Sequence, residues 1–402
     1  MKKLLLATTA LVGFAFAGGA QANVGAASPL KVTLGGDIEV VGATFREKIK
    51  ADGYFKYSDY DFATFYSLNV GVTGKGAGFT YGGELVLDNE AEAAFEFGPR
   101  HVSYENEGNG IKVSKAIVFL EGNFGRVQAG DAQGATDLAV KAPSVGMGQT
   151  IDGGRYVDFL GASDNDLGFP KLFVYGIDGR NNATNITYYT PKFGNEQHKV
   201  QAGITYAPKF WSYGADIAHK DNTYRNVIKG AVAYDGNIDF VALNASAHVI
   251  TGSAGDNVRY GFHDNLRKSF LAWGLGANAS AYGVTIGATY EDLGHFGTPQ
   301  DHRGGQHKIT AGIKYEQDKF GVAFNYTTGK AFNFRENVFS ERARLKGFNA
   351  YGLGGTYKWA PGLTTNADLV FYDGKSGSST DTSYTGSKGD GYVFMLSQKL
   401  AF

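Results

Sequence analysis

Nearly every ordered-looking segment of this sequence alternates apolar and polar residues with a period of two, and helical periodicity is almost absent. Within 282–291, for example, Val284 and Ile286 lie on one face, while Thr285 and Thr289 lie on the other. A strand with this pattern has a different solvent on each face. The alternation therefore predicts an all-β fold whose strands separate an apolar environment from a polar one.

The connections between the predicted strands are of two kinds. Even-numbered strands are followed by tight turns such as 122–123, 235–237 and 317–318, whereas odd-numbered strands are followed by longer, polar loops. This sorting is typical of a closed, antiparallel transmembrane β-barrel with short periplasmic turns and long extracellular loops, and a soluble β-sandwich gives no reason for it. The sixteen predicted strands are 31–45, 62–74, 78–90, 111–122, 124–131, 184–191, 198–208, 227–235, 238–251, 269–280, 282–293, 306–316, 319–329, 347–358, 362–374 and 390–402.

Two other segments, 171–177 and 212–219, also have the pattern of strands. They are assigned to loops, so a barrel of eighteen strands remains an alternative. One barrel accounts for the whole of 23–402, and the sequence predicts no second domain.

The first 22 residues have the pattern of an export signal. Lys2 and Lys3 precede an apolar run over 4–17, which is followed by the small-residue site at 20–22. Cleavage is expected before Asn23. The run is too short to span a bilayer as a helix, and no later segment reaches the roughly 18 uninterrupted apolar residues that a membrane helix needs.

The composition fits a large exported sheet. The 402 residues include 58 Gly, 24 Tyr and 29 Phe but no Cys, so stability does not come from disulfides. The mean hydropathy of -0.23 is compatible with a membrane barrel, because only alternate residues of each strand face lipid. Removal of Lys2 and Lys3 from the 38 basic side chains leaves 36 against 39 acidic ones, which argues against a nucleic-acid partner.

The chain ends in a strand with a terminal aromatic residue. Tyr392, Phe394, Leu396, Leu400 and Phe402 share one face of that strand. This arrangement resembles the C-terminal strand that the outer-membrane assembly machinery recognises.

A motif in the fourth and fifth strands carries a family resemblance. Residues 116–138 run A-I-V-F-L-E-G-N-F-G-R-V-Q-A-G-D-A-Q-G-A-T-D-L, and this stretch resembles the general porins of alphaproteobacteria, in which such a hairpin leads into the inward-folded third loop. The resemblance implies an outer-membrane homotrimer, surrounded by lipid and lipopolysaccharide, through which ions and small hydrophilic solutes diffuse passively. The matching residues are Val118, Phe119, Leu120, Gly122, Phe124, Gly125, Gly130, Asp131, Gly134 and Ala135.

The connection at 132–183 is by far the longest in the chain, and long connections in compact folds are usually functional or disordered. Because the lumen of a sixteen-stranded barrel is too wide for wall side chains to fill, we expect this loop to fold into the lumen. The resemblance implies that its acids face basic wall residues across a constriction. The acidic candidates are Asp131, Asp137, Asp152, Asp158, Asp164 and Asp166, and the basic candidates are Lys115, Lys229, Lys308 and Lys314. Because acids outnumber bases in the loop, the sequence favours mild cation selectivity.

Other functions are weaker alternatives. A substrate-specific channel for a sugar or another nutrient needs a track of lumen aromatics, and alternation places only Phe119, Phe240 and Tyr372 inward. A non-conducting structural or adhesin barrel and a soluble secreted β-protein also remain open. No nucleophile elbow or metal-ligand spacing of histidines predicts an enzyme. No cofactor is predicted, although calcium at Asp164 and Asp166 remains an alternative.

Overall fold

A computed structural model describes residues 30–50, 59–89, 112–148, 156, 159, 183–210, 224–254, 259–260, 263–266, 268–296, 305–330, 345–376 and 388–402. The predicted export signal at 1–22 lies outside these residues. The strands are β1 (Lys31–Lys50), β2 (Tyr60–Gly76), β3 (Phe79–Asp88), β4 (Lys112–Gly122), β5 (Gly125–Asp131), β6 (Thr184–Tyr189), β7 (Phe193–Gly194), β8 (His198–Lys209), β9 (Tyr224–Ile238), β10 (Val241–Ala254), β11 (Arg259–Tyr260), β12 (His263–Leu266), β13 (Phe270–Ala281), β14 (Val284–Gly294), β15 (Gln306–Gln317), β16 (Phe320–Lys330), β17 (Leu345–Ala360), β18 (Leu363–Ser376) and β19 (Lys388–Ala401).

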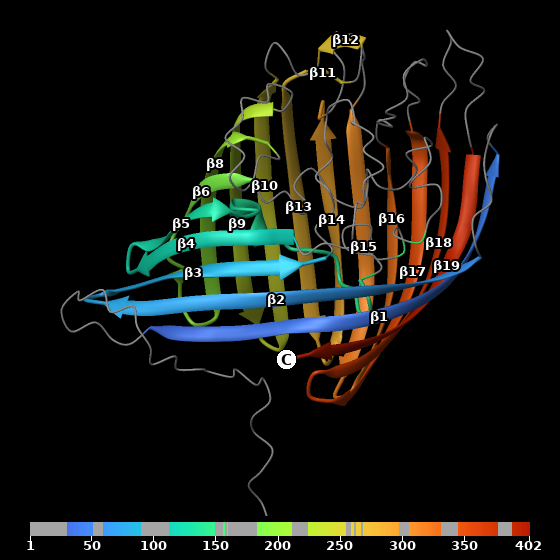
Figure 1. The fold of residues 1–402 in the computed structure, drawn as a ribbon, viewed down its shortest axis with the longest axis horizontal. Coiled ribbons are helices and arrows are strands. Elements are labelled where there is room, and N and C mark those ends of the chain that lie inside the picture. Colours follow the sequence, from blue (N-terminus) through green and yellow to red (C-terminus); the bar gives the residue numbers. More distant parts are fainter. Residues whose placement is uncertain are drawn as a thin grey trace, which may run out of the picture.

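The main sheet closes on itself. Each long strand pairs antiparallel with its neighbours in the chain, and β1 pairs with both β2 and β19 (Figure 1). The short β7 only extends the pairing beside β8, and the β11–β12 hairpin lies beyond the ends of the wall strands in Figure 1. The wall therefore has sixteen strands, and the predicted all-β, antiparallel barrel is confirmed.

The alternative of eighteen strands is wrong for the wall. Strand β5 pairs directly with β6, and β8 pairs directly with β9. No strand therefore lies between the two strands of either pair in the sheet. The segments 171–177 and 212–219, which follow β5 and β8 in the chain, are outside the described residues.

The C-terminal residue takes part in closing the barrel. The backbone N–H of Gly36 donates to the carbonyl of Phe402 at 2.9 Å, and the N–H of Phe402 donates to the carbonyl of Gly36 at 3.0 Å. The two ends of the wall thus meet on the side of the tight turns.

The tight turns lie close to the predicted positions, with one clear exception. Strand β9 continues to Ile238, so the predicted turn at 235–237 is wrong, and the chain turns at Asp239 and Phe240. Asp239 adopts a φ of 52°, a left-handed conformation that aspartate tolerates better than most residues. With the turn at that residue, Gly236 and Asn237 join the ladder by pairing with Leu243 and Ala242.

The two faces of the wall differ as the alternation predicts. Large apolar side chains such as Ile204, Leu275 and Leu353 are exposed on the outside, whereas inward-facing Thr205 and Thr310 are buried. Outward apolar and inward polar faces are those of a barrel in lipid. Within the described residues, no helix has the length and apolar character needed to cross a bilayer.

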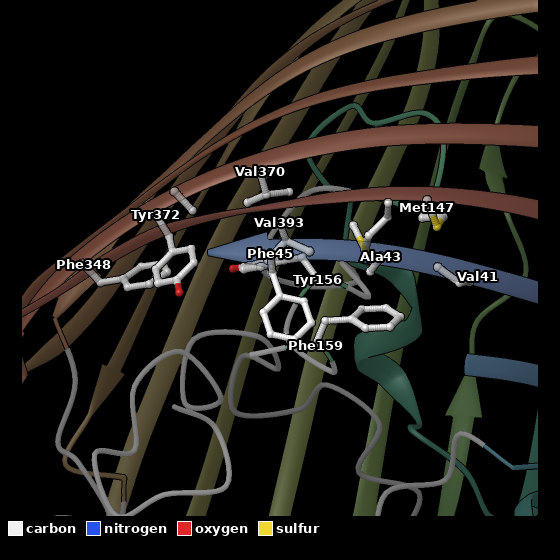
Figure 2. Packing of buried hydrophobic residues seen from close by; sticks show 12 residues of the cluster. Val41, Ala43, Phe45, Met147, Tyr156, Phe159, Phe348, Val370, Tyr372 and Val393 are labelled. Atoms are coloured by element: carbon white, nitrogen blue, oxygen red, sulfur yellow. The ribbon is translucent and has the colours of Figure 1, made fainter. Parts of the chain in front are cut away.

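Two apolar clusters lie inside the barrel, toward the end with the long connections. In one, the rings of Phe210, Tyr224, Phe270 and Phe296 pack at centroid distances between 4.7 and 6.3 Å. The other gathers inward-facing side chains of β1, β17, β18 and β19 around Met147, Tyr156 and Phe159 (Figure 2). Apolar packing therefore occurs where the chain folds back into the lumen.

Candidate pore and its constriction loop

The connection after β5 enters the barrel through a buried polar root. Asp131, the last residue of β5, accepts a hydrogen bond from the Thr184 hydroxyl of β6. The Asn185 amide donates to the carbonyls of Ala132 and Ala183, at 2.5 and 2.7 Å. These bonds join the two ends of the loop to each other and to the wall.

The next part of the loop lies against β6, β8 and β9. The Tyr189 hydroxyl donates to the carbonyl of Gly134 at 2.7 Å, and the Thr205 hydroxyl accepts from the N–H of Ala135 at 2.7 Å. The Lys229 ammonium donates to the carbonyl of Gln133 at 2.7 Å. The single-turn 3-10 helix η1 (Ala135–Leu138) begins at this anchored point.

Further along, the loop crosses the inner wall over β10, β13 and β18. The N–H of Val140 donates to the Ser246 hydroxyl of β10 at 2.7 Å, and the Asn278 amide of β13 donates to the carbonyl of Lys141 at 2.8 Å. The N–H of Met147 donates to the Asp368 carboxylate of β18 at 2.9 Å. The loop therefore follows the wall from β6 to β18, which confirms the predicted inward fold.

The far end of the described loop is held by apolar packing. Figure 2 shows Tyr156 and Phe159 next to Phe45 of β1, and Met147 and Val393 of β19 belong to the same apolar cluster. Tyr156 is fully buried although it belongs to the loop. Polar bonds at the root and apolar contacts at the far end thus hold the loop against one side of the lumen.

The loop divides the inner wall into two regions. The covered wall consists of inward side chains beneath residues 140–147, and the open wall consists of inward side chains on β2, β3, β4 and the short-turn half of β1. The covered wall includes Ser246, Thr289, Lys308, Thr310 and Thr327, all buried. The open wall includes Asp37, Ser67, Asn69, Glu84 and Lys115, all partly or fully exposed. Water therefore has access to one side of the lumen.

The open wall carries paired charges. Lys115 of β4 lies 2.9 Å from Glu84 of β3, and Lys399 of β19 lies 3.0 Å from Asp37 of β1. Nearer the short turns, Arg126 lies 3.7 Å from Glu121 and stacks over the Phe119 ring at 4.1 Å. Each of these three bases has an acid beside it, so this part of the wall is polar without a strong net charge.

Asp137 is the predicted loop acid that the structure places in the lumen. It lies in η1 and is exposed. Removal of surrounding water by the barrel raises the pKa of its carboxyl, and attraction by Lys115, Lys229 and Lys141 opposes that shift. Asp137 and the open-wall Lys115 are therefore within electrostatic reach of each other.

The other candidate residues have different environments. Asp131 is buried at the loop root, and Lys229 is fully buried beneath the loop. Lys308 is 1% exposed and lies 2.8 Å from Glu291, so both lysines fit an anchoring role better than contact with solutes. Lys314 pairs with Glu316 at 2.6 Å near the short turns. Asp152, Asp158, Asp164 and Asp166, together with the calcium alternative, lie outside the described residues.

The three aromatic residues expected inside do not form a track. Phe119 faces the lumen, but Tyr372 is buried in the cluster of Figure 2. The inward placement of Phe240 is wrong, because it lies in the β9–β10 turn with its ring 5.1 Å from the exposed Tyr282. A residue in a turn no longer follows the alternation of its strand.

Sequence reasoning missed two acids that matter to the site. Glu84 pairs with Lys115, and Asp368 anchors Met147. Both lie on inward positions of predicted strands, so alternation identifies their face, but nothing in the sequence indicates which loop residue each one meets. Among the described residues, no group of three or more His, Cys, Asp or Glu side chains has the arrangement of a metal site.

The predicted assembly signal lies on the outer surface. Tyr392, Phe394 and Phe402 are exposed on the face of β19 and of the residue after it. Recognition by the assembly machinery stays a prediction.

Comparisons with known proteins agree with this architecture. Residues 7–377 match the family described as Gram-negative porins. No curated protein sequence matches the chain.

Two solved structures show the same fold. A loop-deletion mutant of OmpT, an outer-membrane protein of Vibrio cholerae, is 12% identical with a TM-score of 0.56, over 93% of this chain and 100% of that one. A double mutant of the Rhodopseudomonas blastica porin is also 12% identical, with a TM-score of 0.51 over 92% and 100% of the two chains. The closed barrel, its inward loop and the family match together show that this chain belongs to the Gram-negative porin family and lies in the outer membrane.

Proposed function

We propose that this porin forms a water-filled channel through which ions and small hydrophilic solutes diffuse passively. The proposal rests on the position of the loop against one side of the lumen. The polar groups of the covered wall are buried, whereas those of the open wall are exposed to water. Small hydrophilic solutes need polar partners along their path, and the open wall supplies hydroxyl, amide, carboxylate and ammonium groups.

The narrowest part of the channel would lie between the loop and the open wall. Asp137 and Lys141 are the exposed charged residues of the described loop, and Glu84 and Lys115 are the nearby pair on the wall. These four charges balance in number. The mild cation selectivity that we propose therefore rests on the sequence of 149–182, which has five acidic and three basic residues.

The assembly of the channel is proposed from the family resemblance. The protein would act as a homotrimer in lipid and lipopolysaccharide after cleavage of residues 1–22 and insertion by the outer-membrane assembly machinery. A barrel exposes broad apolar wall area, part of which a threefold interface would cover.

A substrate-specific channel is less favoured, because Tyr372 is buried in the apolar cluster and Phe240 lies in a turn, which leaves Phe119 alone of the expected aromatic track in contact with the open lumen. A non-conducting barrel is less favoured because the open wall is hydrated.

Single-channel recording of the mature protein in a planar bilayer under a salt gradient tests the proposal. We expect large, long-lived openings that close in three equal steps, with a reversal potential that favours cations. Folded barrels that never conduct would reject the channel, and a saturable block by one class of sugar would favour the specific alternative.

A further inference from the structure

Three glycines of the covered wall lie directly beneath the loop. Gly276, Gly312 and Gly354 are inward-facing residues of β13, β15 and β17. A Cβ atom built on Gly276 would lie 2.5 Å from the carbonyl oxygen of Val140. At Gly312 the corresponding distance to the Pro143 oxygen is 2.4 Å, and at Gly354 the distance to the Val145 oxygen is 2.9 Å.

These distances are shorter than a side chain tolerates. Real Cβ atoms essentially never approach a heavy atom within 3.0 Å, and ordinary contact begins at about 3.4 Å. An alanine at Gly276 or Gly312 therefore requires a separation of about 1 Å between the loop and the wall. Because these three positions have no side chains, the loop can lie as close to the wall as it does.

The loop, rather than the wall, would give way. Each of the three strands is hydrogen-bonded to both of its neighbours along the whole ladder, so its backbone is fixed. In its middle part the loop has fewer attachments, with bonds to Ser246 and Asn278 near one end and to Asp368 at the other. The wall blocks movement outward, so relief of the clash moves the loop away from the wall and toward the lumen.

We propose that Gly276, Gly312 and Gly354 are positioning residues that set the bore of the channel by letting the loop lie against the wall. The inference rests on the proposed channel function. Val140 is next to Lys141 and three residues after Asp137, so a shift at Val140 carries the charged side of the constriction toward Glu84 and Lys115. The path between the loop and the open wall would narrow without any change to the residues that line it.

Gly276→Ala is the cleanest test, because the Val140 carbonyl is the sole group within 3.0 Å of the added atom. At Gly312 and Gly354 the Asn325 and Asp368 side chains also lie close and must move. Gly355→Ala is the matched control, since this neighbour of Gly354 has no heavy atom closer than 3.8 Å to an added Cβ. Heat-modifiable migration in detergent gels verifies that each variant is a folded barrel.

Single-channel conductance and the size limit for neutral polymers are then measured. We expect a lower conductance and a smaller size limit in Gly276→Ala, a greater loss in the double variant with Gly312→Ala, and wild-type values in Gly355→Ala. Deletion of 139–148 supplies a second test. In that background Gly276→Ala should no longer change the conductance, because the residue acts through the loop.

Unchanged or larger conductance in the folded double variant would overturn the proposal, as would an equal loss in the loop-deleted background. Failure of the wild-type protein to conduct would reject the channel function instead, so the two failures are distinguishable.

Discussion

The covered wall and the open wall hold similar ion pairs in different surroundings. Lys308 lies 2.8 Å from Glu291 beneath the loop, and the two side chains are 1% and 19% exposed. Lys115 lies 2.9 Å from Glu84 on the open wall, where the exposures are 31% and 36%. Both pairs join neighbouring strands of one barrel, but the pair on β14 and β15 is shielded from water and the pair on β3 and β4 is in contact with it.

An inward position therefore does not by itself place a residue in contact with the water of the channel. Alternation puts Lys115, Lys229 and Lys308 on the same face of the wall. Their exposure is decided by a segment from elsewhere in the chain. The same charge then serves either to anchor the loop or to meet permeating ions.

The largest effect is expected from removal of one partner of the buried pair. Lys308→Met leaves the Glu291 carboxylate without its cation and should lower the free energy of unfolding by about 3–5 kcal/mol. Lys115→Met breaks the hydrated pair and should cost about 0–1 kcal/mol. Urea unfolding of both variants in detergent micelles measures the difference. The variant with both Lys308→Met and Glu291→Met should recover much of the loss, and equal costs for the two single variants would remove the distinction between the walls.

A second effect concerns the two faces of the open wall. Val70 faces outward between Leu34 and Leu85, whereas the adjacent Asn69 faces the lumen. Val70→Arg places a charge in lipid near mid-strand and should cost about 2–4 kcal/mol in vesicle refolding. Asn69→Arg should leave the stability near wild type and shift the reversal potential toward anions. A stable Val70→Arg barrel would contradict the assignment of its face.

A smaller effect is expected at the root of the loop. Lys229→Met removes the bond to the carbonyl of Gln133 in a buried site and should cost about 1.5–3 kcal/mol. It should also increase the noise of the open-channel current, because the loop loses an anchor. Lys314→Met, which removes a partly exposed lysine outside the loop contact, is the control for both measurements. Quiet channels of wild-type stability from Lys229→Met would show that the anchor is dispensable.

The smallest effect is a shift of ion preference at Asp137. Asp137→Asn should reduce the preference for cations, read from the reversal potential at neutral pH. Because the pKa of Asp137 is raised, its carboxyl takes up a proton at a higher pH than an ordinary aspartate near 3.9. The cation preference of the wild type should therefore begin to fall above the usual aspartate range as the pH is lowered. Identical pH profiles for wild type and Asp137→Asn would exclude this carboxyl from the constriction.

Much of the wall is predictable from the sequence, because period-two alternation is a local property of each strand. The sixteen strands and the opposite faces of Ile286 and Thr289 follow from it. The position of the β9–β10 turn did not follow from the alternation. Gly236 and Asn237 favour turns locally, but they are held in the ladder by pairing with Leu243 and Ala242.

The site was less predictable, because contacts of the loop depend on its path and not on any period. Asp137 was among the predicted acids, and its role in the constriction stays a prediction. The burial of Lys229 and Lys308 was not predicted, since both have the pattern of hydrated lumen residues. Gly276, Gly312 and Gly354 have no distinguishing feature in the sequence among its 58 glycines. Their importance depends on the three carbonyls that the loop places above them.

Thiol reactivity can test directly whether the loop leaves the open wall in contact with water and shields the covered wall from it. The chain contains no cysteine, so Asn69→Cys on the open wall and Thr310→Cys on the covered wall each introduce one thiol. A charged, membrane-impermeant thiol reagent is added while the single-channel current is recorded. We expect a stepwise loss of current in Asn69→Cys and no change in Thr310→Cys, because Thr310 is fully buried. Rapid modification of Thr310→Cys, or an unreactive Asn69→Cys in a conducting channel, would contradict this expectation.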